Sequence, residues 1–107
     1  DYAAAIIQLV GRFPGTPAGN HIANQLMRSG TSPLPNHGEA QAAESQSDFV
    51  HKMSICLKEL RESHRWLRLI GKVTWVKPAG ELDAVLKETD ELIRIFVSSI
   101  RTARKKV

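Results

Sequence analysis

The 107-residue sequence has few features that could cross-link, export or anchor a protein. Its one cysteine cannot form a disulfide within the chain, so a disulfide framework is excluded. It lacks a run of about 18 uncharged apolar residues, which a membrane-spanning helix requires. It also lacks the basic segment and apolar stretch of a secretion signal. We therefore expect one cytoplasmic domain over residues 1–107, without membrane contact and large enough to build its own core.

Breaks in the sequence pattern are sparse as well. Four short stretches rich in proline, glycine or small polar residues interrupt the chain, at residues 14–17, 29–36, 44–47 and 77–80. Between them the apolar residues recur with helical spacing, and no segment alternates as a half-buried strand does. The pattern predicts an all-α fold, an antiparallel up-and-down four-helix bundle.

The first two predicted helices lie before residue 44. The first covers about residues 2–13, and the second begins near Pro17. Pro33 and Pro35 fall inside the second helix. Because a proline removes a helical hydrogen bond and clashes with the preceding turn, we expect this helix to be kinked or broken into two.

The third and fourth predicted helices are longer. Ser47 is the expected N-cap of the third, which runs to about Trp75, and Pro78 marks the start of the fourth. Basic residues gather in the last turns of the fourth helix, where the helix dipole favours positive charge. The expected core seam of the third helix consists of Phe49, Met53, Cys56, Leu60, Leu67 and Ile70.

A second apolar stripe lies on the third helix, roughly 90° or more from its core seam. The stripe consists of Ile55, Trp66, Leu69 and Val73, and Glu59 and Glu62 lie beside it. A bundle core uses one stripe of each helix, so this second stripe either meets another helix within the bundle or forms an oligomer interface. The latter would make the protein a symmetric homo-oligomer.

Basic residues fill the remaining sector of the third helix, at spacings of three and four. This first ridge consists of Lys58, Arg61, Arg65, Arg68 and Lys72. The fourth helix repeats the pattern more loosely, in a second ridge that consists of Lys87, Arg94, Arg101 and Lys105. Two basic ridges can follow the phosphates of RNA or DNA. The alternative is a solvated face that keeps the protein soluble, with local ion pairs to glutamates.

No residue pattern predicts an enzyme, a metal site or a cofactor. The four histidines form no His-x-x-x-His pair, and no Cys-x-x-Cys accompanies them. No Gly-Lys-Ser/Thr motif follows the glycines, so a phosphate loop is absent. Cys56 lies on the core seam, where a free cysteine acts as a small hydrophobic residue. We therefore expect a non-enzymatic protein without catalytic residues, bound metal or cofactor.

Several motifs in the sequence are distinctive. Gln-Leu-x-Arg-Ser-x-Thr-Ser stands at residues 25–32 and Lys-Glu-x-x-Glu-Ser at residues 58–63. Shorter motifs stand around and between them: Asn36-x-x-Glu39-Ala40, Asp48-Phe49, Trp66-Leu67 and Phe96-Val97-Ser98-Ser99-Ile100. In this order they resemble the bacterial four-helix-bundle family that is encoded in intervening sequences of large-subunit ribosomal RNA genes.

The resemblance implies a four-helix bundle that assembles as a homopentamer, in which five copies at +4 each carry +20. It implies structural anchoring of the second helix by Arg28, Asn36 and Glu39. The accessory variability determinant of diversity-generating retroelements is similar to this family, and it binds nucleic acid and a reverse transcriptase. Together with the ridges, this favours binding of RNA or DNA, and a protein-binding scaffold is the alternative.

Overall fold

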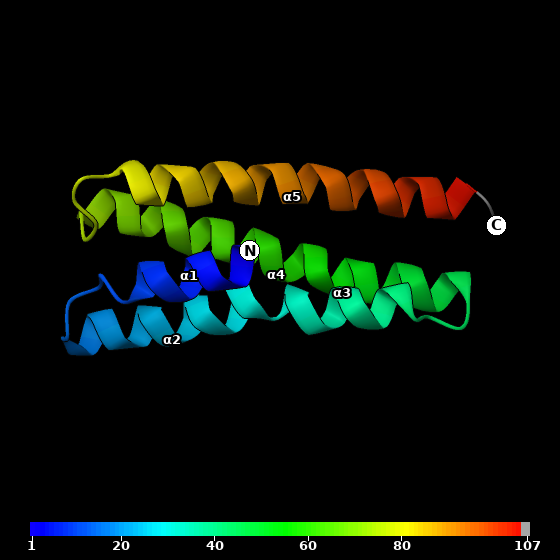
Figure 1. Ribbon diagram of the computed structural model, residues 1–107, viewed down its shortest axis with the longest axis horizontal. Helices are drawn as coiled ribbons and strands as arrows, with labels where there is room; N and C mark the ends of the chain where they lie inside the picture. The colour runs from blue at the N-terminus through cyan, green and yellow to red at the C-terminus, as the bar shows by residue number, and fades with distance from the viewer. Residues whose placement is uncertain (106–107) are drawn as a thin grey trace.

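The computed structural model describes residues 1–105, which form five α-helices and no strand (Figure 1). The helices are α1 (Tyr2–Val10), α2 (Pro17–Thr31), α3 (Pro33–Gln41), α4 (Gln46–Val73) and α5 (Gly80–Lys105). Because α2 and α3 are the two arms of one bent helix, the five segments make the predicted four-helix bundle. The bundle measures 47 × 20 × 19 Å, and α4 and α5 run along its whole length.

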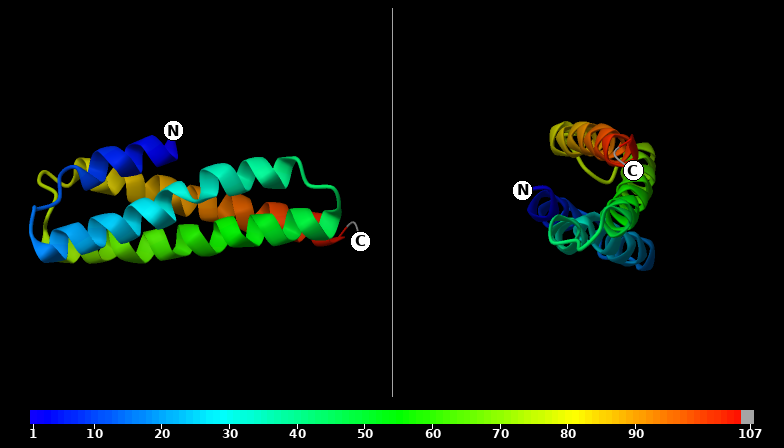
Figure 2. Two further views of the ribbon diagram at one scale, coloured as in Figure 1. Left: turned by 90° about the horizontal axis from the view of Figure 1, so that it is seen from below. Right: turned by 90° about the vertical axis from the view of Figure 1, so that its right-hand side faces the viewer.

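The short helices α1 and α3 lie one after the other along the long axis (Figure 2). α1 packs against α2 and α5, whereas α3 packs mainly against α4. α4 contacts α2, α3 and α5, which makes it the central helix of the bundle. Within residues 1–105, every helix is too short or too polar to cross a membrane.

The proline-containing helix is kinked at Ser32 and Pro33. Pro33 and Pro35 have no N–H, so two carbonyls one turn earlier lose their helical donors. Ser32 nevertheless keeps helical angles, φ −58° and ψ −38°, and its N–H donates to the carbonyl of Arg28 at 3.1 Å. The side chain of Asn36 donates to the carbonyl and to the hydroxyl of Ser32, at 2.9 and 3.0 Å. The chain therefore bends here without leaving the helix for a loop.

The N-cap residue of α4 differs from the predicted one. Ser45, not Ser47, caps the helix, because its hydroxyl accepts the N–H of Asp48 at 3.1 Å. Ser47 is the second residue of the helix, which begins at Gln46, so it lies inside α4 and is not its N-cap. α4 ends at Val73, and Thr74 follows in the left-handed conformation at φ 55° and ψ 40°. A β-branched residue is uncommon in that conformation.

The other boundaries shift by a few residues. α1 ends at Val10 rather than at residue 13, because the N–H of Phe13 bonds the carbonyl only three residues earlier, in a turn. α5 begins at Gly80, two residues after the predicted Pro78. Its last turn contains Arg104 and Lys105, close to the end of the bundle where α3 connects to α4 (Figure 1).

The core is mainly aliphatic, with Tyr2 and Phe96 as its aromatic members, and it encloses two pairs of hydroxyl groups. Every member of the predicted core seam of α4 is buried except Phe49, which is half-buried. The hydroxyl of Tyr2 lies 2.7 Å from that of Thr89, and Ser29 lies 2.8 Å from Ser63. These pairs satisfy polar groups that would be costly to bury alone. Burial raises the pKa of Tyr2.

Gly30 allows α1 to approach α2 closely. A Cβ at this position would lie 2.8 Å from both Cγ1 and Cγ2 of Ile6, which is closer than packed carbon atoms allow. Gly38, in contrast, faces open space on α3. The two glycines therefore have different structural reasons to be present.

Candidate nucleic-acid interface

The first basic ridge is exposed along its whole length on α4. All five of its members are exposed, and they alternate with the buried residues of the core seam on the opposite face. The four members of the second ridge are exposed on α5 as well. Among residues 1–105, none of these nine side chains takes part in an ion pair. The ridges therefore present uncompensated positive charge to solvent.

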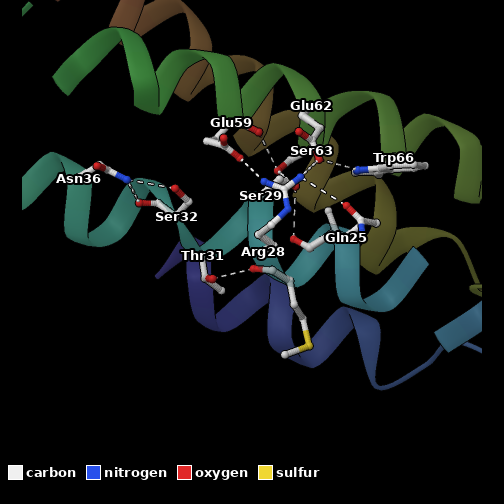
Figure 3. A network of polar contacts seen from close by, with 12 residues as sticks. Gln25, Arg28, Ser29, Thr31, Ser32, Asn36, Glu59, Glu62, Ser63 and Trp66 are labelled. Atoms are coloured by element: carbon white, nitrogen blue, oxygen red, sulfur yellow. Dashed lines mark hydrogen bonds and ion pairs between the residues drawn. The ribbon is translucent and has the colours of Figure 1, made fainter. Parts of the chain in front are cut away.

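The two glutamates beside the first ridge belong to a different contact (Figure 3). Arg28 of α2 pairs with Glu59 at 3.0 Å and with Glu62, and the indole N–H of Trp66 donates to Glu62 at 3.1 Å. Behind them Ser29 and Ser63 make the buried hydroxyl contact between the same two helices. We call this group of residues the α2–α4 seam. In this seam the carboxylates of Glu59 and Glu62 are paired with Arg28 and not with the cations of the first ridge.

The expected anchoring residues act in two different ways. Arg28 ties α2 to α4, and Glu39 ties α3 to α4 through Lys52 at 3.2 Å. Asn36 does not reach a neighbouring helix. Its amide bonds to the carbonyl and the hydroxyl of Ser32 within the bent helix, and so ties the start of α3 to the bend.

The two ridges meet at one end of the bundle, in a hollow of about 490 Å³ between α4 and α5. We call it the α4–α5 groove. Its basic lining consists of Arg61, Arg101, Arg104 and Lys105. The remaining lining consists of Ser54, Leu57, Val97 and Ile100, so no carboxylate of residues 1–105 lines this groove.

The other predicted ridge residues lie outside this groove. Lys58 and Arg65 line a neighbouring hollow along α4, which they share with Arg61 and with Glu62. The rest of the first ridge, Arg68 and Lys72, lies at the opposite end of the bundle. There the two residues share a hollow with Lys77 and Asp83. Lys87 and Arg94 are exposed on α5 and line none of these three hollows. The ridges therefore converge at one end only and do not form two parallel tracks.

Arg104 and Lys77 are candidate residues that the ridge pattern missed. Arg104 lies three residues after Arg101, on a neighbouring sector of α5, and it reaches the groove only because α5 runs antiparallel to α4. The cluster of basic residues in the last turns of α5 was the available sequence signal for Arg104. Lys77 stands in the connection between α4 and α5, outside any helical periodicity.

The second apolar stripe divides into two parts. Trp66 is half-buried, packs against the core and bonds to the α2–α4 seam. Ile55 is also half-buried, whereas Leu69 and Val73 are 40% and 44% exposed. Trp66 thus packs within the bundle, and Leu69 and Val73 leave an apolar patch on the surface of α4.

Two of the four histidines, His37 and His64, and the cysteine are held in structural contacts. His64 lies 3.0 Å from Asp90 on α5, and the ring of His37 packs against that of Phe96 with centroids 5.5 Å apart. Cys56 is buried, and burial raises the pKa of its thiol to about 11. Among residues 1–105 no three His, Cys, Asp or Glu side chains come together in an arrangement that could hold a metal ion.

The bent second helix and the α2–α4 seam place the protein in a class of small antiparallel four-helix bundles. The chain belongs to the 23S rRNA-intervening sequence protein family, whose model matches residues 1–98. It is similar to the crystal structure of a protein of unknown function from the S23 ribosomal protein family of Bacteroides thetaiotaomicron VPI-5482. That similarity has a TM-score of 0.84 and 28% sequence identity, over 92% of this chain and 91% of that chain. No curated protein matches the chain. The family resemblance in the sequence motifs is thereby confirmed.

Proposed function

We propose that the protein is a non-enzymatic homo-oligomeric bundle that binds RNA or DNA through phosphate contacts at its basic ridges. One observation supports this most strongly: four basic side chains from two helices line the α4–α5 groove, with no carboxylate among the side chains of the described residues that line it. Cations that attract phosphates release condensed counterions from the nucleic acid, and this release drives binding.

The distribution of the ion pairs argues against a face that serves solubility alone. A solvated helix face usually mixes charges of both signs, and pairs at i and i+4 stabilise it. In this chain Glu59 and Glu62 pair across to Arg28 instead of along α4 to the ridge. Among residues 1–105 the first ridge therefore forms no ion pair of its own, although Glu62 lines one hollow with Lys58 and Arg65.

The salt dependence of affinity tests the proposal. We expect the wild type to bind RNA or DNA with a steep negative slope of log K against log salt concentration. The variant Arg61→Gln/Arg65→Gln/Arg68→Gln removes three cations from the first ridge. Its slope should be shallower by about 2 to 3, because each lost phosphate contact removes about 0.7 to 0.9 from it.

A matched control separates local contacts from net charge. The variant Gln8→Glu/Asn20→Asp/Asn24→Asp also lowers the net charge by three, at exposed positions on α1 and α2. It should retain the wild-type slope. Equal flattening in both variants, or no wild-type affinity even at about 50 mM salt, would contradict the proposal.

Self-association is the second part of the proposal. The exposed patch of Leu69 and Val73 supports an interface, and the homopentamer implied by the family resemblance would cover it and bring five basic grooves onto one particle. Sedimentation of Leu69→Glu/Val73→Glu should show a smaller particle than the wild type. Ile7→Glu changes another exposed apolar residue, 52% exposed on α1, and should leave the mass unchanged. An unchanged mass of the Leu69→Glu/Val73→Glu variant would exclude this patch as the interface.

The alternative is an accessory subunit that binds another protein, such as a reverse transcriptase, without touching nucleic acid. Leu34 and Ile95 favour it, because they are 62% and 56% exposed and would gain from a protein partner. Under this alternative the positive charge only keeps the protein soluble. It therefore predicts no nucleic-acid affinity at about 50 mM salt and no effect of the arginine substitutions.

A further inference from the structure

The α4–α5 groove has a floor that phosphate binding alone does not need. Its rim is cationic, whereas its floor is apolar and consists of Leu57, Val97 and Ile100. Ile100 is 5% exposed and belongs to the core, while Leu57 and Val97 are half-buried. A ligand that only placed phosphates on the rim would leave this apolar surface in water.

The width of the groove limits what can enter it. α4 and α5 are packed helices, whose axes lie about 8–10 Å apart in such contacts. A double helix keeps its bases inside and presents sugars and phosphates, so it would touch the rim and bridge over the floor. A single strand can keep its phosphates on the rim and turn unpaired bases inward.

We infer that the α4–α5 groove prefers single-stranded nucleic acid to duplex. Unpaired bases contact the floor of Leu57 and Val97, while the phosphates lie on the surrounding cations. Arg61 and Arg101 serve both purposes, because a planar guanidinium can pair with a phosphate or stack on a base. This inference rests on the proposed function and specifies its ligand.

Direct competition between two probes tests the preference. The probes are an oligothymidylate of about 16 nucleotides, which forms no duplex with itself, and a DNA duplex of the same length. At equal salt the oligothymidylate should bind at least about fivefold more tightly, as expected from one well-placed base. Equal affinity or tighter duplex binding would overturn the inference and leave the proposed function intact. If neither probe binds, the proposed function itself fails, and the inference fails with it.

A gain-of-affinity variant tests the position of the bases. Ser54 is half-buried and lines the groove, so Ser54→Phe adds an aromatic ring beside the floor. It should tighten oligothymidylate binding at least about fivefold and leave duplex binding unchanged. Ser98→Phe is the matched control, because Ser98 is exposed on α5 and lines a different hollow. An equal effect of the two variants, or no effect of Ser54→Phe, would contradict the inferred geometry.

A loss-of-affinity variant and an acidic competitor complete the test. Val97→Ser removes apolar surface from the floor without changing the charge, and should weaken oligothymidylate binding more than duplex binding. Poly-glutamate supplies negative charge without bases. If it displaces oligothymidylate as well as an equal charge of unlabelled oligothymidylate does, the groove recognises charge alone and the inference is overturned.

Discussion

The two sides of α4 carry the same kinds of charged residue in different settings. On the side of α2, Arg28 lies between Glu59 and Glu62, and Trp66 donates to one of them. On the side of α5, Arg61 lies among three other cations in the α4–α5 groove. An arginine between two carboxylates holds two helices together, whereas an arginine among cations attracts anions from solution. The role of an arginine in this bundle therefore depends on its neighbours across the helix contact.

This comparison predicts that changes on the two sides have separable effects. Changes on the packed side, where α2 and α3 meet α4 and α1 meets α2, should alter the free energy of unfolding and change the affinity of the folded protein little. Changes in the α4–α5 groove should do the reverse.

Alkaline pH should destabilise the packed side while the groove keeps its charge. The thiol of Cys56 has its pKa raised from 9.0 to about 11 by burial. Between these values the unfolded chain loses a proton that the native chain retains, so the unfolded state binds fewer protons and the free energy of unfolding falls as pH rises. The loss is at most about 1.4 kcal/mol for each pH unit in that window.

Denaturant titrations at pH 8, 9, 10 and 11 would measure this loss. Cys56→Ala should remove most of the decline below pH 10, whereas the part above pH 10 that comes from Tyr2 should remain, because burial raises the pKa of Tyr2 as well. Arginines stay charged throughout this range, so the folded protein should still bind anions. The same decline in Cys56→Ala as in the wild type would contradict this assignment.

Two glycine substitutions should change stability in opposite directions. Gly30→Ala should lower the free energy of unfolding by about 1–2 kcal/mol, because the new Cβ overlaps Ile6 and overpacking outweighs the better helix propensity of alanine. Gly38→Ala should raise it by up to about 1 kcal/mol, because nothing lies within 4 Å of its Cβ. Thermal unfolding of both variants checks this contrast. Equal changes in the stability of the two variants would mean that α1 moves away to accommodate the methyl group at position 30.

Thr74→Gly should stabilise the protein by about 1 kcal/mol. Thr74 follows α4 with φ at 55°, a conformation that costs a residue with a Cβ but not glycine. Chemical denaturation should show a higher midpoint with an unchanged slope. Because Thr74 lies far from the α4–α5 groove, the salt dependence of nucleic-acid binding should stay as in the wild type. Lower stability of the variant would show that the threonine contacts outweigh the backbone cost.

The smallest effect is expected for Arg28→Gln. The ion pairs of Arg28 are half-exposed, so their loss should cost less than about 1 kcal/mol of stability. The substitution also leaves Glu59 and Glu62 without their partner, next to the basic ridge. Nucleic-acid affinity should therefore fall slightly although residue 28 does not line the α4–α5 groove. Gln25→Glu adds a negative charge on α2, and it should also lower the nucleic-acid affinity slightly.

Helical periodicity was a sound guide to the elements of this fold. Leu60, Leu67 and Ile70 recur at helical spacing, and the structure buries all three on one face of α4. The exposed position of the basic ridge follows from the same periodicity, since Arg61 and Arg65 lie opposite that face. The N-cap of α4 was harder to predict from the sequence. Ser45 and Ser47 both satisfy the residue preference, and only hydrogen-bond geometry distinguishes them.

The candidate site was only partly predictable for a similar reason. Periodicity within one helix places residues on that helix, but it does not say which residue of another helix lies opposite. Arg61 and Arg104 are 43 positions apart in sequence, and they line one groove because α4 and α5 pack antiparallel with a particular register. For Trp66, the sequence left an inner and an outer role open, and its contact with Glu62 and the core places it within the bundle.

Spacing and local motifs along the chain were enough to predict the helical class, the family and the exposure of the basic residues. The pairing of the charges depends instead on how the helices pack against one another. Arg28 pairs with Glu59 and Glu62 across a helix contact. Arg61 lies instead with Arg101 and Arg104 in a groove that no carboxylate of residues 1–105 lines. Pairing between charges depends on distance in space, which a pattern along one chain does not contain.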